Sequence, residues 1–224
     1  MGSISVRYEP TGILFDPHNG YIYVANKETI SVIDPAKNSV VVNVKVGGRP
    51  ASLAFDPANN LIYIARNRDP SVIAISDATN SVEGSFRVGY STGVAFDPSN
   101  GFLYITRTVG KVVVWNPTTS QLVKEINNRG IPLGILYDPQ NQLIYVSGIR
   151  GRLDTKGFVD VIDGTTNSYV DEINLGCKAF PLALDTPTQE LIAPCTDVGV
   201  VHILSTYLTP PMATSLLRPR TTQL

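Results

Sequence analysis

The stretch FDPHNGYIYVAN, residues 15 to 26, decides the fold because the chain repeats it. The same pattern returns as FDPANNLIYIAR from Phe55, FDPSNGFLYITR from Phe96 and YDPQNQLIYVSG from Tyr137. Successive aspartates of these copies are 40, 41 and 41 residues apart, and a weaker fifth copy, LDTPTQELI, follows 47 residues later: Asp16, Asp56, Asp97, Asp138 and Asp185. A fixed period of this length predicts one supersecondary unit repeated about five times.

Each unit contains four short runs of β-branched and aromatic residues, separated by clusters of Gly, Pro, Asn and Asp. A short apolar run such as ASLAF is followed by a Tyr-containing run such as LIYIAR, then by ISVID or VVVWN, and last by a half-polar run such as VVNVKV. Such runs indicate strands, and no helical period of useful length is present. Four antiparallel strands in 40 to 45 residues are typical of a propeller blade, so the chain is predicted to be an all-β, β-propeller protein of about five four-stranded antiparallel blades.

The repeated turns have a structural explanation that needs no ligand. In Asp16-Pro17-His18-Asn19-Gly20, the aspartate accepts from a backbone N–H two residues on, proline sets φ, and Asn or Gly tolerates the left-handed conformation. A second set of turns, DPAKN, NPTTS and DGTTN, has the same chemistry. The recurring aspartates are therefore predicted to form hairpins rather than to catalyse a reaction.

The blade pattern also resembles a known family. YIYVAN, with Tyr23, Val24, Ala25 and Asn26, followed by TISVIDPAKNSVVVNVKVGGRP, resembles the YVTN-type β-propeller repeat of archaeal surface-layer-associated and bacterial periplasmic proteins. The resemblance covers about residues 3 to 205. It implies a cell-surface, extracellular or periplasmic protein and a propeller of about seven blades.

Five repeats leave two arrangements open, a closed five-blade ring or part of a seven-bladed propeller. In the closed ring, the N-terminal stretch SISVRYEP would supply the fourth strand of the last blade. Residues 1–207 are assigned to the propeller repeats and residues 208–224 to a Pro/Thr-rich tail or linker.

Composition excludes several classes of protein. The 224 residues are 43% hydrophobic and 17% charged, which is typical of one globular domain. The 18 basic and 19 acidic residues nearly cancel, so no nucleic-acid partner is expected. The longest apolar runs are too short to span a membrane, and MGSISVRYEP lacks the n- and h-regions of a secretion signal.

The inventory of catalytic groups is short. The chain has two histidines, His18 in a turn and His202 in the apolar run VVHILS, and no His or Cys stands at metal-ligand spacing from His202. Nucleophile-elbow, dinucleotide, P-loop and HExxH motifs are absent from the sequence. We therefore predict a non-catalytic binding or structural module with no cofactor and no metal; the alternative is a hydrolase or lactonase with its site at the axial channel.

Three features break the repeat. The fourth unit carries an insertion, GIRGRLDTKGF, which lengthens one loop. Asp160 stands where earlier units place small or apolar residues; together with Asp163 it is a weak candidate for a cation site, and a solvent-exposed side chain is expected. Cys177 and Cys195 flank the first two strands of the fifth unit and form a possible disulfide, the alternative being two buried thiols.

Basic residues gather in the loops at one end of the blades, opposite the end that carries the aspartate turns. Clustered arginines favour carboxylate or phosphate ligands, so this loop face is predicted to bind an anionic protein or glycan, although individually solvated arginines explain the same pattern. The partner-binding candidates are Arg49, Arg66, Arg68, Arg107, Arg129, Arg150, Arg152, Lys156 and Lys178.

Overall fold

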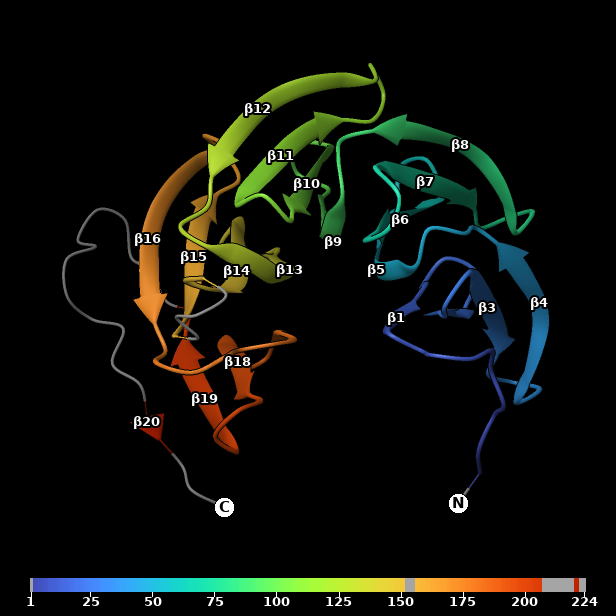
Figure 1. Cartoon of the computed structure of the whole chain (residues 1–224). Helices are drawn as coiled ribbons and strands as arrows, with labels where there is room; N and C mark the ends of the chain where they lie inside the picture. The colour runs from blue at the N-terminus through green and yellow to red at the C-terminus, as the bar shows by residue number, and fades with distance from the viewer. Residues whose placement is uncertain (1, 152–155, 207–219, 222–224) are drawn as a thin grey trace.

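A computed structural model describes residues 2–151, 156–206 and 220–221 of the chain. The described residues form strands and turns without any helix, so none of them belongs to a helix that could cross a membrane. Their strands make five four-stranded antiparallel sheets, each built from consecutive strands and placed around one axis (Figure 1). The chain is therefore a five-bladed β-propeller, as its repeat predicts.

Each blade corresponds to one copy of the repeat. Blade 1 contains β1 (Gly12–Phe15), β2 (Ile22–Ala25), β3 (Thr29–Asp34) and β4 (Ser39–Lys45). Blade 2 contains β5 (Pro50–Asp56), β6 (Leu61–Arg66), β7 (Ser71–Ser76) and β8 (Ser81–Arg87). Blade 3 contains β9 (Ser91–Asp97), β10 (Phe102–Arg107), β11 (Lys111–Asn116) and β12 (Gln121–Asn127). Blade 4 contains β13 (Ile131–Asp138), β14 (Leu143–Ile149), β15 (Gly157–Asp163) and β16 (Ser168–Asn174). Blade 5 contains β17 (Ala183–Asp185), β18 (Glu190–Cys195), β19 (Val200–Ser205) and β20 (Arg220–Thr221).

The first strand of each blade lies nearest the axis, and the fourth forms the outer rim (Figure 1). The inner strands contact one another in chain order, from β1 through β5, β9 and β13 to β17. Two ends of the propeller follow from this topology. The "turn face" carries the first and third connections of each blade, and the "loop face" carries the second connections and the linkers between blades.

The hydrophobic core lies between the blades. Between blades 1 and 2, for example, Tyr23 packs with Ile62, Ile64 and Ile73 of the next sheet. The buried tyrosine keeps its polar end paired, because its hydroxyl donates to Asn80 Oδ1 at 2.8 Å. Strand alternation thus supplies two apolar faces per blade, and stacking buries them.

The aspartate turns have the predicted structure. The backbone N–H two residues on donates to Asp16, Asp56, Asp97 and Asp138 Oδ1 at 2.8 to 3.0 Å, and Asp34 and Asp163 accept in the same way. The four aspartates of the FDP and YDP turns are fully buried. They stabilise the hairpins and add little exposed negative charge to the turn face.

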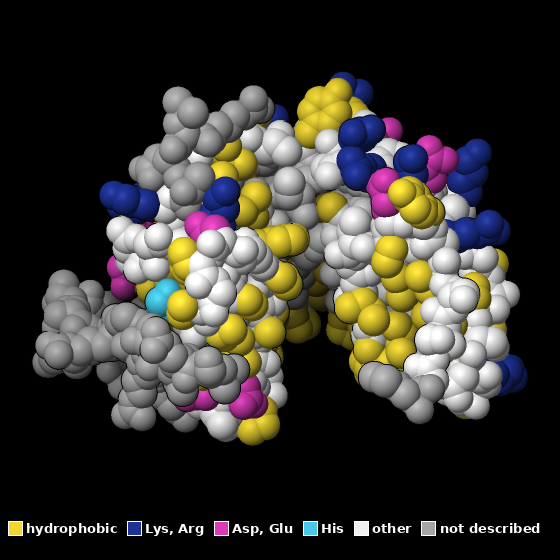
Figure 2. Space-filling view, turned by 60° about the horizontal axis from the view of Figure 1, so that its bottom comes forward, with side chains coloured by type: hydrophobic (Ala, Val, Ile, Leu, Met, Phe, Trp, Pro, Cys, Tyr) yellow, Lys and Arg dark blue, Asp and Glu magenta, His cyan; other side chains and the backbone are white. Residues whose placement is uncertain are grey.

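Blades 1 and 5 stand on either side of an opening (Figure 1), and Figure 2 shows hydrophobic side chains on the surfaces that border it. On blade 1 the most exposed of the apolar residues are Ile13 and Phe15. Of the two arrangements left open by the sequence, the one in which the N-terminal stretch completes blade 5 is not formed: residues 2–10 form no strand, and β19 pairs with β20. In this pairing, His202 lies opposite Thr221 and Ile203 lies opposite Arg220.

Candidate functional site

The loop face collects the predicted basic residues. Arg49, Arg129 and Lys178 lie in linkers between blades, and the remaining described candidates lie at or near second connections: Arg66, Arg68, Arg107, Arg150 and Lys156. Arg152 lies outside the described residues. Most Lys and Arg side chains visible in Figure 2 line one edge of the molecule, with several Asp and Glu among them.

Nearby carboxylates pair with five of these arginines. Arg49 contacts Glu9 at 2.9 Å, Arg66 contacts Asp69 at 2.7 Å, and Arg107 contacts Glu125 at 2.9 Å. Arg129 and Arg150 share Glu172, and Lys111 shares Glu125 with Arg107. The positive charge of the loop face is therefore partly neutralised within the protein.

Sequence reasoning missed Glu125 and Glu172. Both stand near the ends of outer strands, in QLVKEIN and SYVDEIN, and the antiparallel register carries them to the loop face. The shared Glu-Ile-Asn at the same repeat position was the available signal. That these glutamates pair with arginines of the loop face depends on which strand end lies beside which loop, and this is set by the tertiary structure.

Arg66 has a structural role. Its side chain is buried, and its three nitrogen groups donate to Val46 O at 2.8 Å, Ser71 O at 3.0 Å and Asp69 Oδ1 at 2.7 Å. Val46 lies at the start of the linker that enters blade 2, so Arg66 holds that linker against the sheet. Because these donors are already used, Arg66 is poorly placed to bind a partner.

A second group of charges lies on blade 4. Asp160 Oδ2 accepts the backbone N–H of Arg129 at 3.3 Å, while its other oxygen is buried without a partner among the described residues. The guanidinium groups of Arg129 and Arg150 lie over the rings of Tyr169 and Phe158. The expectation that Asp160 is exposed is wrong: its side chain is 1% exposed, because the linker before blade 4 covers it. Asp163 is not its partner, since Asp163 caps its own turn.

Burial raises the pKa of Asp160 to about 6, with a smaller contribution from the neighbouring Glu172. The native state therefore holds this proton more tightly than the unfolded chain, and the cost of ionising it appears as the pH rises from about 4 to 6. We expect Asp160→Asn, which keeps an acceptor for Arg129, to raise the free energy of unfolding by about 2 kcal/mol at pH 8 and to leave it unchanged near pH 4. Thermal unfolding of both proteins at the two pH values measures this difference. An equal effect at both pH values would contradict the assignment.

A groove opens between blades 2 and 3 at the loop face. Its volume is about 500 Å³, and it runs from Pro70 and the linker 88–90 along β11 and β12 of blade 3. Three large hydrophobic residues in it are mostly exposed, Tyr90 at 53%, Val109 at 66% and Leu122 at 54%. Trp115 also lines it, stacked on Phe86 with ring centroids 4.8 Å apart.

Two cations and one anion line the same groove. Arg87 is exposed, and Arg107 bonds Glu125 while its guanidinium lies against Gly89. Gly89 has a φ of +103°, a conformation that favours glycine, and the absence of a side chain lets the Arg107 guanidinium approach its backbone. The groove thus combines exposed apolar surface with excess positive charge.

A smaller cavity of about 330 Å³ lies near the axis, among the inner strands β1, β5, β9 and β13. Hydroxyl groups line part of it: Thr11 donates to Pro50 O and Thr92 to Pro132 O, which link neighbouring inner strands. Ser52 adds a third hydroxyl group, the other lining residues are glycine, alanine, proline and larger apolar residues, and none of the described residues around the cavity is titratable. Nothing in this cavity specifically favours the hydrolase or lactonase alternative.

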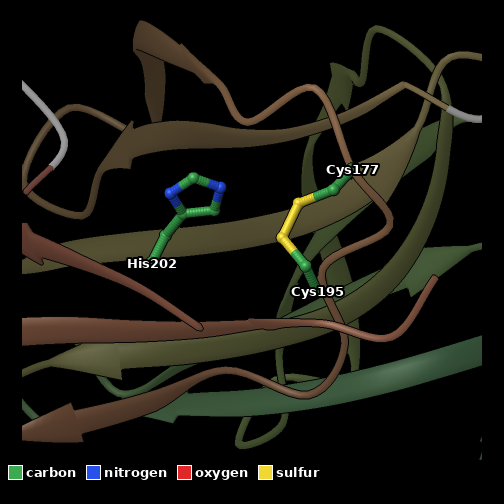
Figure 3. A group of neighbouring side chains, drawn as sticks. All are labelled: Cys177, Cys195 and His202. Atoms are coloured by element: carbon green, nitrogen blue, oxygen red, sulfur yellow. A yellow bond between two sulfur atoms is a disulfide. The ribbon is translucent and has the colours of Figure 1, made fainter. Parts of the chain in front are cut away.

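The two cysteines meet at the boundary between blades 4 and 5. A disulfide joins Cys177, in the linker, to Cys195 at the end of β18, with the Cα atoms 5.5 Å apart. Cys195 occupies the repeat position that Arg66 holds in blade 2. Arg66 hydrogen-bonds the linker that enters blade 2, and the disulfide bonds the linker that enters blade 5 to the same position of the second strand. Sequence reasoning found no ligand partner for His202, but His202 lies beside both sulfur atoms (Figure 3).

Comparisons with known proteins support the fold. No protein-family model matches the chain, and no curated protein matches its sequence. Among solved structures, Kuenenia stuttgartiensis hydrazine synthase aligns over 92% of this chain and 66% of its own, with a TM-score of 0.79 and 14% identity. The fold is a β-propeller.

Two further structures agree. The β-propeller domain of Myceliophteria thermophila Cps50 (Swd1) has a TM-score of 0.76 at 12% identity, over 97% of this chain and 72% of that one. A chain of a mitotic checkpoint complex has a TM-score of 0.72 at 13% identity, over 87% of this chain and 60% of that one. The chain thus spans 60 to 72% of the length of these structures, and at such identities the likeness extends to the fold alone.

Proposed function

We propose that this propeller is a non-catalytic binding module of the YVTN type, at a cell surface or in a periplasm, that binds an anionic partner through its loop face. The observation that carries the proposal is the groove between blades 2 and 3, which is lined by Arg87, Arg107 and the exposed side chains of Tyr90, Val109 and Leu122. Large exposed apolar side chains rimmed by charge are typical of interaction sites. The repeat pattern and the cysteine pair support the family and the compartment.

The chemistry of the groove favours an acidic protein segment over a glycan. Exposed Tyr90, Val109 and Leu122 provide apolar surface for side chains of a peptide, whereas a sulfated glycan would use only the cations. Arg87 is the freer of the two arginines, because Arg107 already pairs with Glu125. An acidic segment with interspersed leucine or aromatic residues is therefore the expected partner.

Trp115 is the chain's single tryptophan and lines the groove, so its fluorescence reports on occupancy directly. We expect a synthetic peptide that alternates glutamate and leucine to change this emission, and a lysine–leucine peptide to leave it unchanged. Arg87→Glu should weaken binding about tenfold, roughly the value of one charge-assisted hydrogen bond. Leu122→Ser should weaken it as well, and raising the salt should weaken binding of the parent protein.

Lys45→Glu, on the exposed outer edge of blade 1, is the matched control for a change of charge and should bind the peptide normally. Heparin serves as the glycan probe. Heparin binding that is sensitive to Arg87→Glu but not to Leu122→Ser would identify a glycan site instead. No response of Trp115 to either probe, or equal binding by Arg87→Glu, would contradict a partner site in this groove.

A further inference from the structure

We propose that Cys177, Cys195 and His202 bind one thiophilic metal ion, Zn²⁺ in the first instance, whenever the two cysteines carry thiols instead of the disulfide. Two sulfurs and one imidazole are a ligand set that suits zinc. The inference does not depend on the proposed binding function or on the groove between blades 2 and 3. It applies to the protein in a reducing compartment or before the disulfide forms.

The antiparallel register of blade 5 brings two of these ligands together. Cys195 pairs with Val200 and Ala193 with His202, so Cys195 and His202 project from the same face of neighbouring strands. Cys177 reaches this face from the linker that enters the blade. One ligand atom from each residue lies within 4.8 Å of the other two, and Figure 3 shows the imidazole next to the sulfur pair.

This spacing fits a metal. With Zn–S bonds of about 2.3 Å and Zn–N bonds of about 2.0 Å, tetrahedral ligation separates ligand atoms by roughly 3.5 to 3.8 Å. After reduction the two sulfurs must move apart to about this separation, while the imidazole is already within 4.8 Å of both. The cysteines are buried, whereas His202 is partly exposed.

The state of His202 is an independent observation. Its Nδ1 is buried and has no hydrogen-bond partner among the described residues. A buried polar nitrogen normally has a partner. Because no described side chain or backbone group occupies this nitrogen, the ring is available as a ligand once the two cysteines are thiols.

The fold itself does not require this ligand set. The positions equivalent to Cys195 and His202 are Asn26 and Ser31 in blade 1, and Arg66 and Ile73 in blade 2. In blade 4 they are Gly148 and Asp160. Propeller blades of this chain therefore form without a sulfur–imidazole pair, and the combination in blade 5 is specific to that blade.

Metal binding and disulfide formation exclude each other. Each thiol loses its proton to the solvent and donates a sulfur lone pair to the ion, and the neutral ring donates through one nitrogen, so two protons are released per ion and no electron is transferred. In the disulfide the same sulfurs are bonded to each other and are no longer thiolates. The site therefore holds either a disulfide or a metal.

Cobalt spectroscopy on the full chain tests this proposal. The protein is reduced, freed of reductant under nitrogen and titrated with Co²⁺. We expect one equivalent to produce thiolate-to-cobalt absorption and the intense visible bands of a tetrahedral site, and Zn²⁺ to abolish them. The oxidised protein, which contains the same residues, should give only the weak spectrum of aqueous Co²⁺.

Histidine variants separate this site from a simple dithiol. His202→Gln should lower the affinity of the reduced protein by about a hundredfold, because loss of even an outer-shell partner costs 10–100-fold. It should also shift the visible bands. His18→Gln, at the chain's other histidine, is the matched control and should leave both unchanged. Zn²⁺ should raise the melting temperature of the reduced parent protein but not of reduced His202→Gln.

Two results would overturn the proposal. One is a reduced protein whose Co²⁺ spectrum remains that of the aqueous ion. The other is a folded His202→Gln protein, verified by circular dichroism, with the affinity and spectrum of the parent, which would show that the cysteines act without the imidazole.

Discussion

Phe96→Ala is expected to lower the free energy of unfolding by about 3–5 kcal/mol, whereas Phe15→Ala should lower it by about 1 kcal/mol or less. The two phenylalanines occupy the same position of the repeat. Phe96 is 7% exposed and packs between blades 2 and 3, whereas Phe15 is 58% exposed at the opening beside blade 1. Loss of the buried ring removes apolar burial and leaves a cavity; loss of the exposed ring does neither to a comparable extent.

Denaturant unfolding of the two variants, followed by circular dichroism, measures this difference. Each variant is the control for the other, because the substitution and its repeat position are identical. Equal destabilisation would mean that the surface of blade 1 is covered in solution. The comparison therefore also tests whether the apolar surface at the opening faces solvent.

Removal of the disulfide is expected to lower the free energy of unfolding by about 3 kcal/mol, because the bond closes a loop between residues 18 apart in sequence. The double variant Cys177→Ala/Cys195→Ala should lose about this amount and become insensitive to reductant. Alanine avoids placing hydroxyl groups at these buried positions. Unfolding curves with and without a reductant, in the absence of metal, give the comparison.

Thiol counting provides the control. The chain has two cysteines, so denatured, unreduced protein from an oxidising host should contain no titratable thiol. Two titratable thiols would contradict the pairing. The same count on protein taken from its natural source bears on the proposed compartment, because disulfides persist in oxidising environments.

The loop face shows how far charge patterns can be interpreted from sequence. The topology of an up-and-down blade places Arg107 and Arg150 at the same end, and this was predictable. Their partners Glu125 and Glu172 were not identified, because they lie on the fourth strand of the blade, whereas the arginines lie at the end of the second strand. The groove was not predicted either, since Tyr90, Val109 and Leu122 are far apart in the repeat and meet only through packing between blades.

What the sequence by itself determined is the repeating unit. A fixed spacing, strand-forming runs and the Asp-Pro turns are local properties, and local hydrogen bonds such as Asp56 Oδ1 with the N–H of Ala58 enforce them in every copy. The grouping of the strands into four-stranded blades of antiparallel order follows from this repetition. These features were predictable because each depends on residues that are neighbours along the chain.

Only the tertiary structure decided which copies of a residue are exposed and which side chains meet. Phe15 and Phe96 have the same local sequence, yet the neighbouring blade buries one of them. Asp160 is buried because a linker from the preceding blade covers it, and His202 meets Cys177 because strand register and a linker converge. Burial and contact are set by segments distant in sequence, so no local pattern contains them.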